Sequence, residues 1–306
     1  MNSLQYKKRQ LQLLASILRC SPAEIEFMCE HIESYYRKWV EQKKDKITGK
    51  VKTYPDGTPK TRVIRPSSGR LKEIQRSIRI NILSKIQLPE VIQGGVKGKS
   101  NISNAKQHQG KKYQFVTDLQ DFFPSVTPKQ INSLFLSLGY SHHIAYWLTK
   151  LTSLEFQLPQ GTSTSTALAN LVFWKTDQKL MAICQQYDIQ YTRFVDDLSF
   201  SSFRDFRDIT VQLLDIVRSD GFKISYRKTA YAGKQTLTGI RVFNNYIDAP
   251  DKIKQKAKQE HLLPVEVPRP YSNYLHRIRM TNKPVIIDAK SRSKPEQLSD
   301  LPKSIK

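Results

Sequence analysis

The sequence predicts an α+β fold, and three kinds of stretch support that prediction. Residues 189–201 hold two runs rich in β-branched and aromatic side chains that flank Asp196 and Asp197, a pattern typical of a β-hairpin with both aspartates at its tip. Residues 113–119 form a second run of this kind, which also reaches an aspartate. Elsewhere, as in residues 11–18, apolar side chains recur at helical spacing.

The other elements can be placed in chain order. Residues 3–44 are expected to be helical, with a capped helix start at 21–24. Residues 42–60 are charged and turn-rich, which indicates an exposed hairpin or loop. Further short strands and amphipathic helices are expected: strands at 62–66, 221–225 and 236–242, and helices at 71–86, 134–154 with a break at 138–140, 167–187, 206–218, from about 250, and 271–279.

The aspartates are the first candidates for chemistry. Adjacent carboxylates repel each other unless a cation lies between them, and Mg²⁺ prefers oxygen ligands. The alternative is a polar turn, because aspartate is a common turn residue. Asp118 at the end of the other strand weighs against this alternative. Carboxylates of Asp118, Asp196 and Asp197 on two neighbouring strands would hold two Mg²⁺ ions, the usual apparatus of in-line phosphoryl transfer.

The charge of the chain indicates a polyanionic partner. Lys and Arg number 50 against 27 Asp and Glu, which gives a net charge of +23. Nucleic acid fits this excess, and an anionic membrane surface is the competing explanation. No run of about 18 apolar residues is present, so no membrane partner is expected. The cysteines at 20, 29 and 184 have no paired zinc spacing, which favours a reducing compartment and a cytoplasmic location.

Ordered motifs carry a resemblance to a known family. Residues 118–125, 158–161 and 194–197 look like three motifs of a reverse-transcriptase palm. Within that superfamily the chain most resembles bacterial retron reverse transcriptases. Residues 104–108 match the retron pattern Asn-Ala-x-x-His, and Leu237-Thr238-Gly239 is close to the retron Val-Thr-Gly. The resemblance spans roughly residues 60 to 245.

The resemblance implies a right-hand polymerase with fingers, an antiparallel-sheet palm and a small helical thumb. The implied division of the chain is an N-terminal helical region at 1–45, fingers at 46–112, a palm with remaining fingers elements at 113–245, a thumb at 246–283, and a flexible basic tail at 284–306.

The resemblance also assigns nucleotide-binding roles. Lys60, Arg62 and Lys72 are candidates for the incoming triphosphate, although scattered basic residues on a helix are often only a solvated face. Phe123 would be the gate that excludes a ribose 2′-hydroxyl, with a core role for either Phe122 or Phe123 as the alternative. Gln160 would touch the nucleotide or the template base.

Further roles concern the leaving group and the RNA. Lys228 would be the general acid for pyrophosphate, against the alternative of an ordinary surface lysine. Asn104 and His108 lie four apart on one helix face and are assigned to RNA binding or local scaffolding. Thr238 and Gly239 would belong to a primer-gripping hairpin that contacts RNA, and Gly239 inside a strand would permit close backbone approach.

Two positions depart from the retron pattern. Residues 162–166 are Ser and Thr only, where prolines and small residues usually follow the glycine. Phe194 replaces the usual Tyr before the Asp pair and therefore lacks a hydroxyl for the primer strand, but the metal ligands are retained.

The expected function follows from the resemblance. The chain would be an RNA-directed DNA polymerase that uses deoxynucleoside triphosphates to copy its own structured non-coding RNA into a short DNA, primed from a 2′-hydroxyl in that RNA. Its partners would be that RNA, the DNA made from it and a companion effector protein in phage defence. The alternatives are a non-retron bacterial reverse transcriptase and, in another class, a catalytically silent RNA-binding scaffold.

Overall fold

The computed structural model describes residues 3–44, 49–233, 236–262, 264 and 266–282. It confirms the α+β class. The flexible tail predicted at 284–306 lies outside the described residues. Among the described residues, no helix is both long and apolar enough to cross a membrane.

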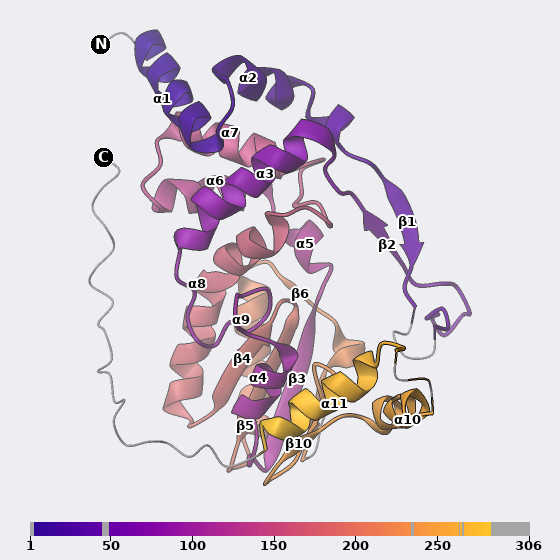
Figure 1. Cartoon of the computed structure of the whole chain (residues 1–306). Helices are drawn as coiled ribbons and strands as arrows, with labels where there is room; N and C mark the ends of the chain where they lie inside the picture. Colours follow the sequence, from indigo (N-terminus) through magenta and orange to yellow (C-terminus); the bar gives the residue numbers. More distant parts are fainter. Residues whose placement is uncertain (1–2, 45–48, 234–235, 263, 265, 283–306) are drawn as a thin grey trace, which may run out of the picture.

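An antiparallel sheet forms the centre of the molecule (Figure 1). Its strands run in the order β4-β5-β3-β6, and β7 also pairs with β3. The strands are β3 (Tyr113–Gln120), β4 (Gln190–Phe194), β5 (Asp197–Ser202), β6 (Lys223–Ile224) and β7 (Ala230–Ala232). Because β3 is paired on both sides, side chains at its end are held in a fixed register with those of β5.

Alternation along the strands gives the sheet two different faces. Phe115 and Phe200 face the main core, where α8 (Ser165–Gln186) and α9 (Thr210–Ser219) pack. Val116 packs on the opposite face against a second, smaller core. Asp118 lies two residues after Val116 on the same strand, so its side chain is on the same face as Val116, away from α8.

Helices at the N-terminal end extend the main core (Figure 1). A capping box at Ser21 starts the second helix as predicted, because its hydroxyl accepts from Glu24 N at 3.2 Å. These helices are α1 (Ser3–Leu18), α2 (Pro22–Glu30), η1 (Ile32–Tyr35), α3 (Gly69–Asn81), η2 (Leu83–Lys85), α5 (Phe122–Ser125), α6 (Pro128–Ser137) and α7 (His142–Thr152).

The helical prediction for residues 3–44 is wrong at its C-terminal end. β1 (Trp39–Gln42) is a strand that pairs with β2 (Thr61–Ile64). Trp39 and Val40 are residue types that favour strands, and β2 supplies the missing partner from a distant part of the chain. The predicted exposed hairpin at 42–60 therefore begins with this paired ribbon.

The smaller core lies at the other end of the sheet (Figure 1). Its elements are α4 (Asn101–Gln107), β8 (Thr236–Leu237), β9 (Ile240–Val242), β10 (Ile247–Asp248), α10 (Asp251–Glu260) and α11 (Pro270–Met280). The single strand predicted at 236–242 is wrong in detail. Thr238 and Gly239 form a tight turn between β8 and β9, with φ of +45° and +85°, so Gly239 lies in a turn and not inside a strand.

Candidate active site

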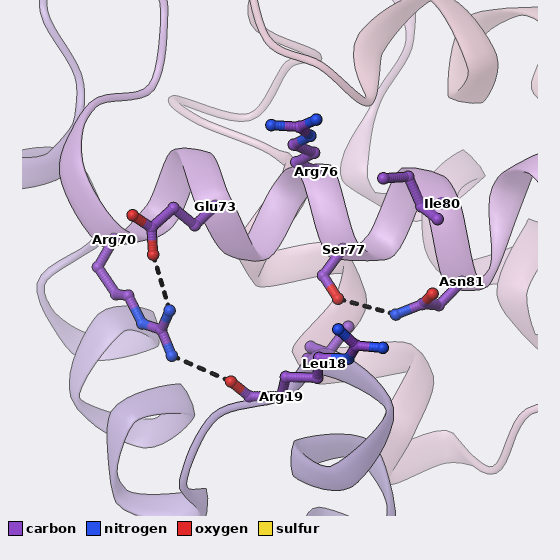
Figure 2. A pocket seen from close by; sticks show the side chains of 8 residues that line it. All are labelled: Leu18, Arg19, Arg70, Glu73, Arg76, Ser77, Ile80 and Asn81. Atoms are coloured by element: carbon purple, nitrogen blue, oxygen red, sulfur yellow. Dashed lines mark hydrogen bonds and ion pairs between the residues drawn. The ribbon is translucent and has the colours of Figure 1, made fainter.

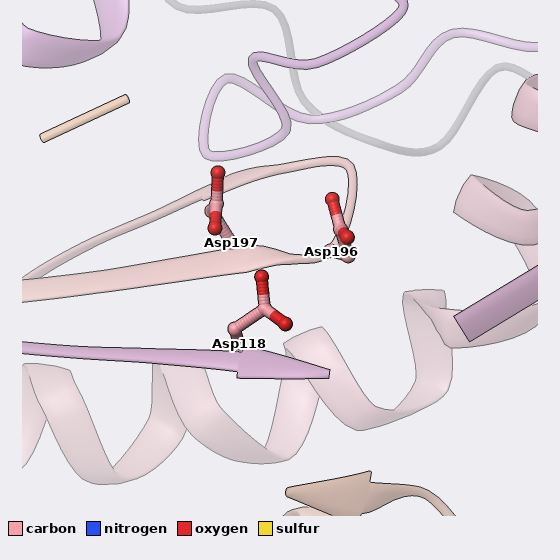
Figure 3. A group of neighbouring side chains, drawn as sticks. All are labelled: Asp118, Asp196 and Asp197. Carbon is pink, nitrogen blue, oxygen red and sulfur yellow. The ribbon is translucent and has the colours of Figure 1, made fainter. Parts of the chain in front are cut away.

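Three carboxylates meet where β3 ends and β4 turns into β5 (Figure 3). Asp118 lies directly across from Asp197 in the antiparallel register, and Asp196 is in the connecting turn. One ligand oxygen from each of the three lies within 4.8 Å of the others. The turn is tied to β3, because Leu119 N donates to Asp196 O at 2.9 Å. The structure thus brings together the aspartates that the sequence predicted as neighbours.

The electrostatics of this cluster fit a cation. Burial, together with repulsion from Asp196 and Asp118, raises the pKa of Asp197 to about 7. Burial and the charge of Asp118 also raise the pKa of Asp196. Carboxylates this close repel one another when all are ionised, and the charge of a bound cation would remove that repulsion. Oxygen ligands are also those that a hard divalent ion prefers. The three aspartates therefore fit a divalent metal site.

Lys228 forms an ion pair with Asp118. It follows β6 on the short helix η4 (Tyr226–Lys228), and its Nζ lies 2.5 Å from Asp118 Oδ1. Burial opposes the charged form of Lys228, but the hydrogen bond to Asp118 and the nearby aspartates outweigh it and raise the lysine pKa. The side chain is 61% exposed. Lys228 thus places a positive charge beside the aspartates, and its role as a proton donor stays a prediction.

A cleft of about 180 Å³ opens beside the carboxylates. It lies between the sheet face that carries Asp118 and the small core, and it is lined by Val116, Thr117, Asp118, Asp197, Leu198, Ser199, Lys228, Thr236, Leu237 and Thr238. The β8–β9 turn at Thr238 therefore borders the same space as the metal-ligand candidates.

A family model described as reverse transcriptase (RNA-dependent DNA polymerase) matches residues 42–261, which contain the whole cluster. The chain belongs to the reverse transcriptase family. The retron Ec86 reverse transcriptase of Escherichia coli is 33% identical over 214 residues, covering 66% of this chain and 65% of that protein. The retron Mx65 reverse transcriptase of Myxococcus xanthus is 32% identical over 208 residues, covering 59% and 48%.

The alignment with either retron enzyme spans less than two thirds of that enzyme's length. Among solved structures, apo telomerase from Candida tropicalis superposes with a TM-score of 0.41 at 10% identity, covering 60% of this chain and 45% of that one. That superposition is too weak to add to the family match.

None of the residues predicted to bind the nucleotide is among those that line the cleft beside the carboxylates. Phe122 is buried in the core, and Phe123 is half-buried beside it on α5, which leaves Phe123 as the candidate gate. Gln160 is half-buried, and its carbonyl accepts from Arg65 N at 2.8 Å. This hydrogen bond joins the Gln160 loop to the end of β2.

Two of the three predicted fingers cations contact other side chains of the protein. Arg62 Nη2 pairs with Glu41 at 2.7 Å across the β1–β2 ribbon, and Lys60 Nζ lies 5.2 Å from the ring centroid of Tyr54. Lys72 is exposed on α3. Their triphosphate roles stay predictions.

Lys43 was missed by the sequence analysis. Its positive charge favours the ionised form of Asp196 and so lowers the Asp196 pKa. Burial and the charge of Asp118 have the larger effect, and the pKa is raised overall. Its backbone N donates to Lys60 O at 2.7 Å, so the β1–β2 pairing positions it. Only knowledge of that pairing would have singled it out among so many lysines.

Asn104 and His108 are buried, with exposures of 0% each. Thr192 Oγ1 donates to Asn104 Oδ1 at 2.7 Å, so the Nε2 of His108, 2.7 Å from the same hydroxyl, is the donor to it. The other ring nitrogen lies 2.7 Å from Ser201 Oγ. Burial, with a smaller effect of Lys111, lowers the His108 pKa to about 3.

These buried contacts favour the scaffolding alternative for Asn104 and His108, because every polar atom named points into the protein, and their contact with RNA stays a prediction. Asn104 Nδ2 lies 3.4 Å from Thr238 Oγ1, so the same scaffold reaches the β8–β9 turn. Thr238 is half-buried and Gly239 is exposed, and their contact with RNA stays a prediction.

A second depression of about 270 Å³ lies where the end of α1 meets α3 (Figure 2). Its arginines suggest an anion site in so basic a chain, but their bonds indicate a structural joint. Arg70 donates to Arg19 O at 3.1 Å and to Glu73 at 2.7 Å, while Asn81 donates to Ile17 O at 2.8 Å. The bonds to Arg19 O and Ile17 O satisfy carbonyls at the C-terminal end of α1, and so hold α1 on α3.

Proposed function

We propose that this chain is a retron-type, RNA-directed DNA polymerase that copies its own structured non-coding RNA into a short DNA joined to that RNA. It acts in the cytoplasm with deoxynucleoside triphosphates as substrates and two Mg²⁺ ions as cofactors. The observation that carries the proposal is the cluster of Asp118, Asp196 and Asp197 in a chain of the reverse transcriptase family. The similarity to retron enzymes supports the choice of template.

The chain's own residues would do the following. Asp118, Asp196 and Asp197 would hold the two Mg²⁺ ions, which when bound activate the primer hydroxyl and neutralise the triphosphate. Lys228 would give a proton to the pyrophosphate leaving group. Phe123 would exclude a 2′-hydroxyl, and Gln160 would orient the base. The cleft beside β8 and β9 would receive the primer end.

The biological role follows from the same similarity. Priming from a 2′-hydroxyl of the RNA would leave RNA and DNA covalently joined, and a companion effector would use that product in phage defence. The net charge of +23 supports a nucleic-acid partner over a small metabolite.

Nucleic acid that co-purifies from cells carrying the native flanking DNA tests this proposal. We would treat one half with RNase and the other with DNase, and sequence what remains. The wild-type protein should yield one RNA joined to a short complementary DNA, and Asp196→Asn should yield the RNA alone. If the wild-type protein carries RNA without DNA, the proposed polymerase function is contradicted. If a folded Asp196→Asn variant carries DNA, the assigned site is contradicted.

A further inference from the structure

The turn that carries Asp196 has a costly backbone. Val195 has φ of +61°, a left-handed conformation that β-branched residues rarely adopt. No glycine or asparagine is present in residues 194–197 to ease it. A strained residue directly before a metal-ligand candidate persists only if its surroundings fix it. The surroundings of Val195 therefore show what sets the position of the aspartates.

A buried guanidinium lies directly behind this turn. Arg193 on β4 has an exposure of 0%, and its Nη1 donates to Val195 O at 3.0 Å. The same nitrogen donates to Asn170 Oδ1 at 2.8 Å. Nε and Nη2 donate to the two oxygens of Asp177 at 2.9 and 2.7 Å. One planar group thus connects α8 to the carbonyl of the strained residue.

The acidic partner is itself fixed. Asp177 on α8 is fully buried, and Tyr191 Oη donates to its Oδ1 at 2.7 Å. The guanidinium carbon of Arg193 lies 4.8 Å from the ring centroid of Phe173, which adds a cation–π contact. A buried charge pair is a poor way to gain stability compared with apolar packing. The hydrogen bonds of Arg193, however, are directional, and one of them is donated to Val195 O in the turn that carries Asp196.

The segment before α4 closes the turn from a further side. Asn170 Nδ2 donates to Gly94 O at 2.9 Å, and Gln93 N donates to Arg193 O at 2.8 Å. A Cβ on Gly94 would lie 2.3 Å from Val195 N. Gly94 is thus the residue type that lets this backbone lie against Val195. Arg193, Asn170 and Gly94 enclose one strained peptide.

We propose that Arg193 is a positioning residue for the metal-binding turn. Through its bond to Val195 O, it would hold Asp196 and Asp197 at the spacing that two cations require, with Asp177 and Asn170 fixing the guanidinium. This inference rests on the proposed function. Small displacements of catalytic groups have large effects on rate, so the loss of this bond should weaken cation binding and turnover more than stability alone explains.

Arg193→Lys on the full chain tests the proposal. Lysine keeps the charge, but its compact ammonium cannot serve Asp177, Asn170 and Val195 O together. We expect Mn²⁺ affinity, measured by calorimetry without nucleotide, to fall about tenfold. We expect kcat for DNA synthesis to fall 10- to 100-fold while the KM for deoxynucleotide changes less than twofold. Amide exchange of the peptide at 193–198 should become faster.

Controls separate position from stability. Met28→Ala removes a buried side chain of α2, far from the turn in sequence and in a different layer, and should lower stability without changing Mn²⁺ affinity. Lys179 lies on the same helix as Asp177 and forms an ion pair with Asp220, which is outside that helix. Lys179→Met breaks this pair and should change neither the stability nor the Mn²⁺ affinity. Asp177→Asn is a second test if Arg193→Lys fails to fold, with a smaller effect in the same direction.

Rescue provides the sharpest outcome. Glycine adopts positive φ without strain, so Val195→Gly in the Arg193→Lys background should restore part of the Mn²⁺ affinity. If Arg193→Lys follows Met28→Ala in all readouts at equal loss of stability, Arg193 is only a core residue and the proposal is overturned. If the wild type binds Mn²⁺ but makes no DNA, the proposed function fails, while Mn²⁺ affinity and amide exchange still decide the role of Arg193.

Discussion

Two antiparallel ribbons of this protein differ in how they are held. Along β5 every residue after Asp197 is buried, and its neighbours β3 and β4 pair with it on both sides. Along β1 every residue is exposed, and along β2 only Ile64 is partly covered. The first ribbon builds the carboxylate cluster before any substrate arrives. The second carries Arg62 on an exposed surface, so if Arg62 binds the triphosphate as predicted, contact with the substrate must fix its final position.

The largest expected effect comes from the buried ribbon. Asp197→Asn should reduce DNA synthesis by about 10³-fold or more, because a metal ligand is lost. The raised pKa of Asp197 means that its ionisation disfavours the folded state as pH rises from about 4 toward 7, so this variant should have a higher Tm than the wild type at pH 7.5. A primer-extension assay measures the loss of DNA synthesis. Scanning calorimetry with and without Mg²⁺ measures the Tm, and Mg²⁺ should raise the Tm of the wild type alone. A lower Tm for the variant would contradict the repulsion described here.

The next effect concerns close packing under the catalytic turn. Gly94→Ala should destabilise the protein by about 1–3 kcal/mol and lower DNA synthesis, since the added methyl group must displace Val195. Gly98→Ala is a matched control four residues later, where a Cβ would meet nothing within 4 Å. Its φ of +81° still adds about 1 kcal/mol of strain, so activity distinguishes the two better than stability. Equal activities would refute the packing role of Gly94.

A pH effect of intermediate size should arise from His108. Its pKa is lowered to about 3 in the folded protein, against about 6.5 when unfolded, so the unfolded chain binds the extra proton. Stability is therefore lost as pH falls below about 6.5, by about 2 kcal/mol between pH 7.5 and 5. Urea unfolding at both pH values should show that His108→Gln lacks this part of the loss. The exposed His142→Gln should keep it, and an unchanged pH dependence in His108→Gln would rule out the buried neutral ring as its source.

The smallest effect is expected from the exposed ribbon. Arg62→Ala should cost less than about 1 kcal/mol in stability, because its pair with Glu41 is about half exposed. If Arg62 turns to the triphosphate, the KM for deoxynucleotide should rise several-fold with little change in kcat. Glu41→Ala removes the same ion pair without touching the substrate and should leave KM unchanged. Steady-state kinetics of both variants decide whether the ribbon contributes to the site.

The contrast between the ribbons also shows what could be predicted from sequence. Asp118, Asp196 and Asp197 were predictable because aspartates end two strand-like runs, and because the motifs around them resemble a reverse-transcriptase palm. The strand at Trp39–Gln42 was missed because its partner β2 lies far along the chain. Asn104 and His108 could be placed on one helix face, but the threonine and serine that bond them come from β4 and β5. Local patterns cannot show such distant partners.

Arg193 and Gly94 illustrate the same limit. An arginine in a basic chain suggests an exposed contact with phosphate, yet this one is among the most buried residues of the protein. Its identity as an internal group depends on Asp177 on a separate helix. Gly94 stands in a glycine-rich stretch, residues 94–98, where sequence alone gives no reason to single it out, and the structure shows that its missing side chain makes room for Val195.

The central strand also bears on how the protein is made. β3 pairs with β5, β6 and β7, and all of these follow it in the chain. During synthesis, Asp118 leaves the ribosome long before Asp197 and Lys228, so the carboxylate cluster and its lysine cannot assemble until residue 228 has emerged. Until β5 has emerged, β3 is an unpaired strand with apolar side chains, which is prone to aggregate. Fragments that stop within the palm should therefore be insoluble or chaperone-bound, and none should retain partial activity.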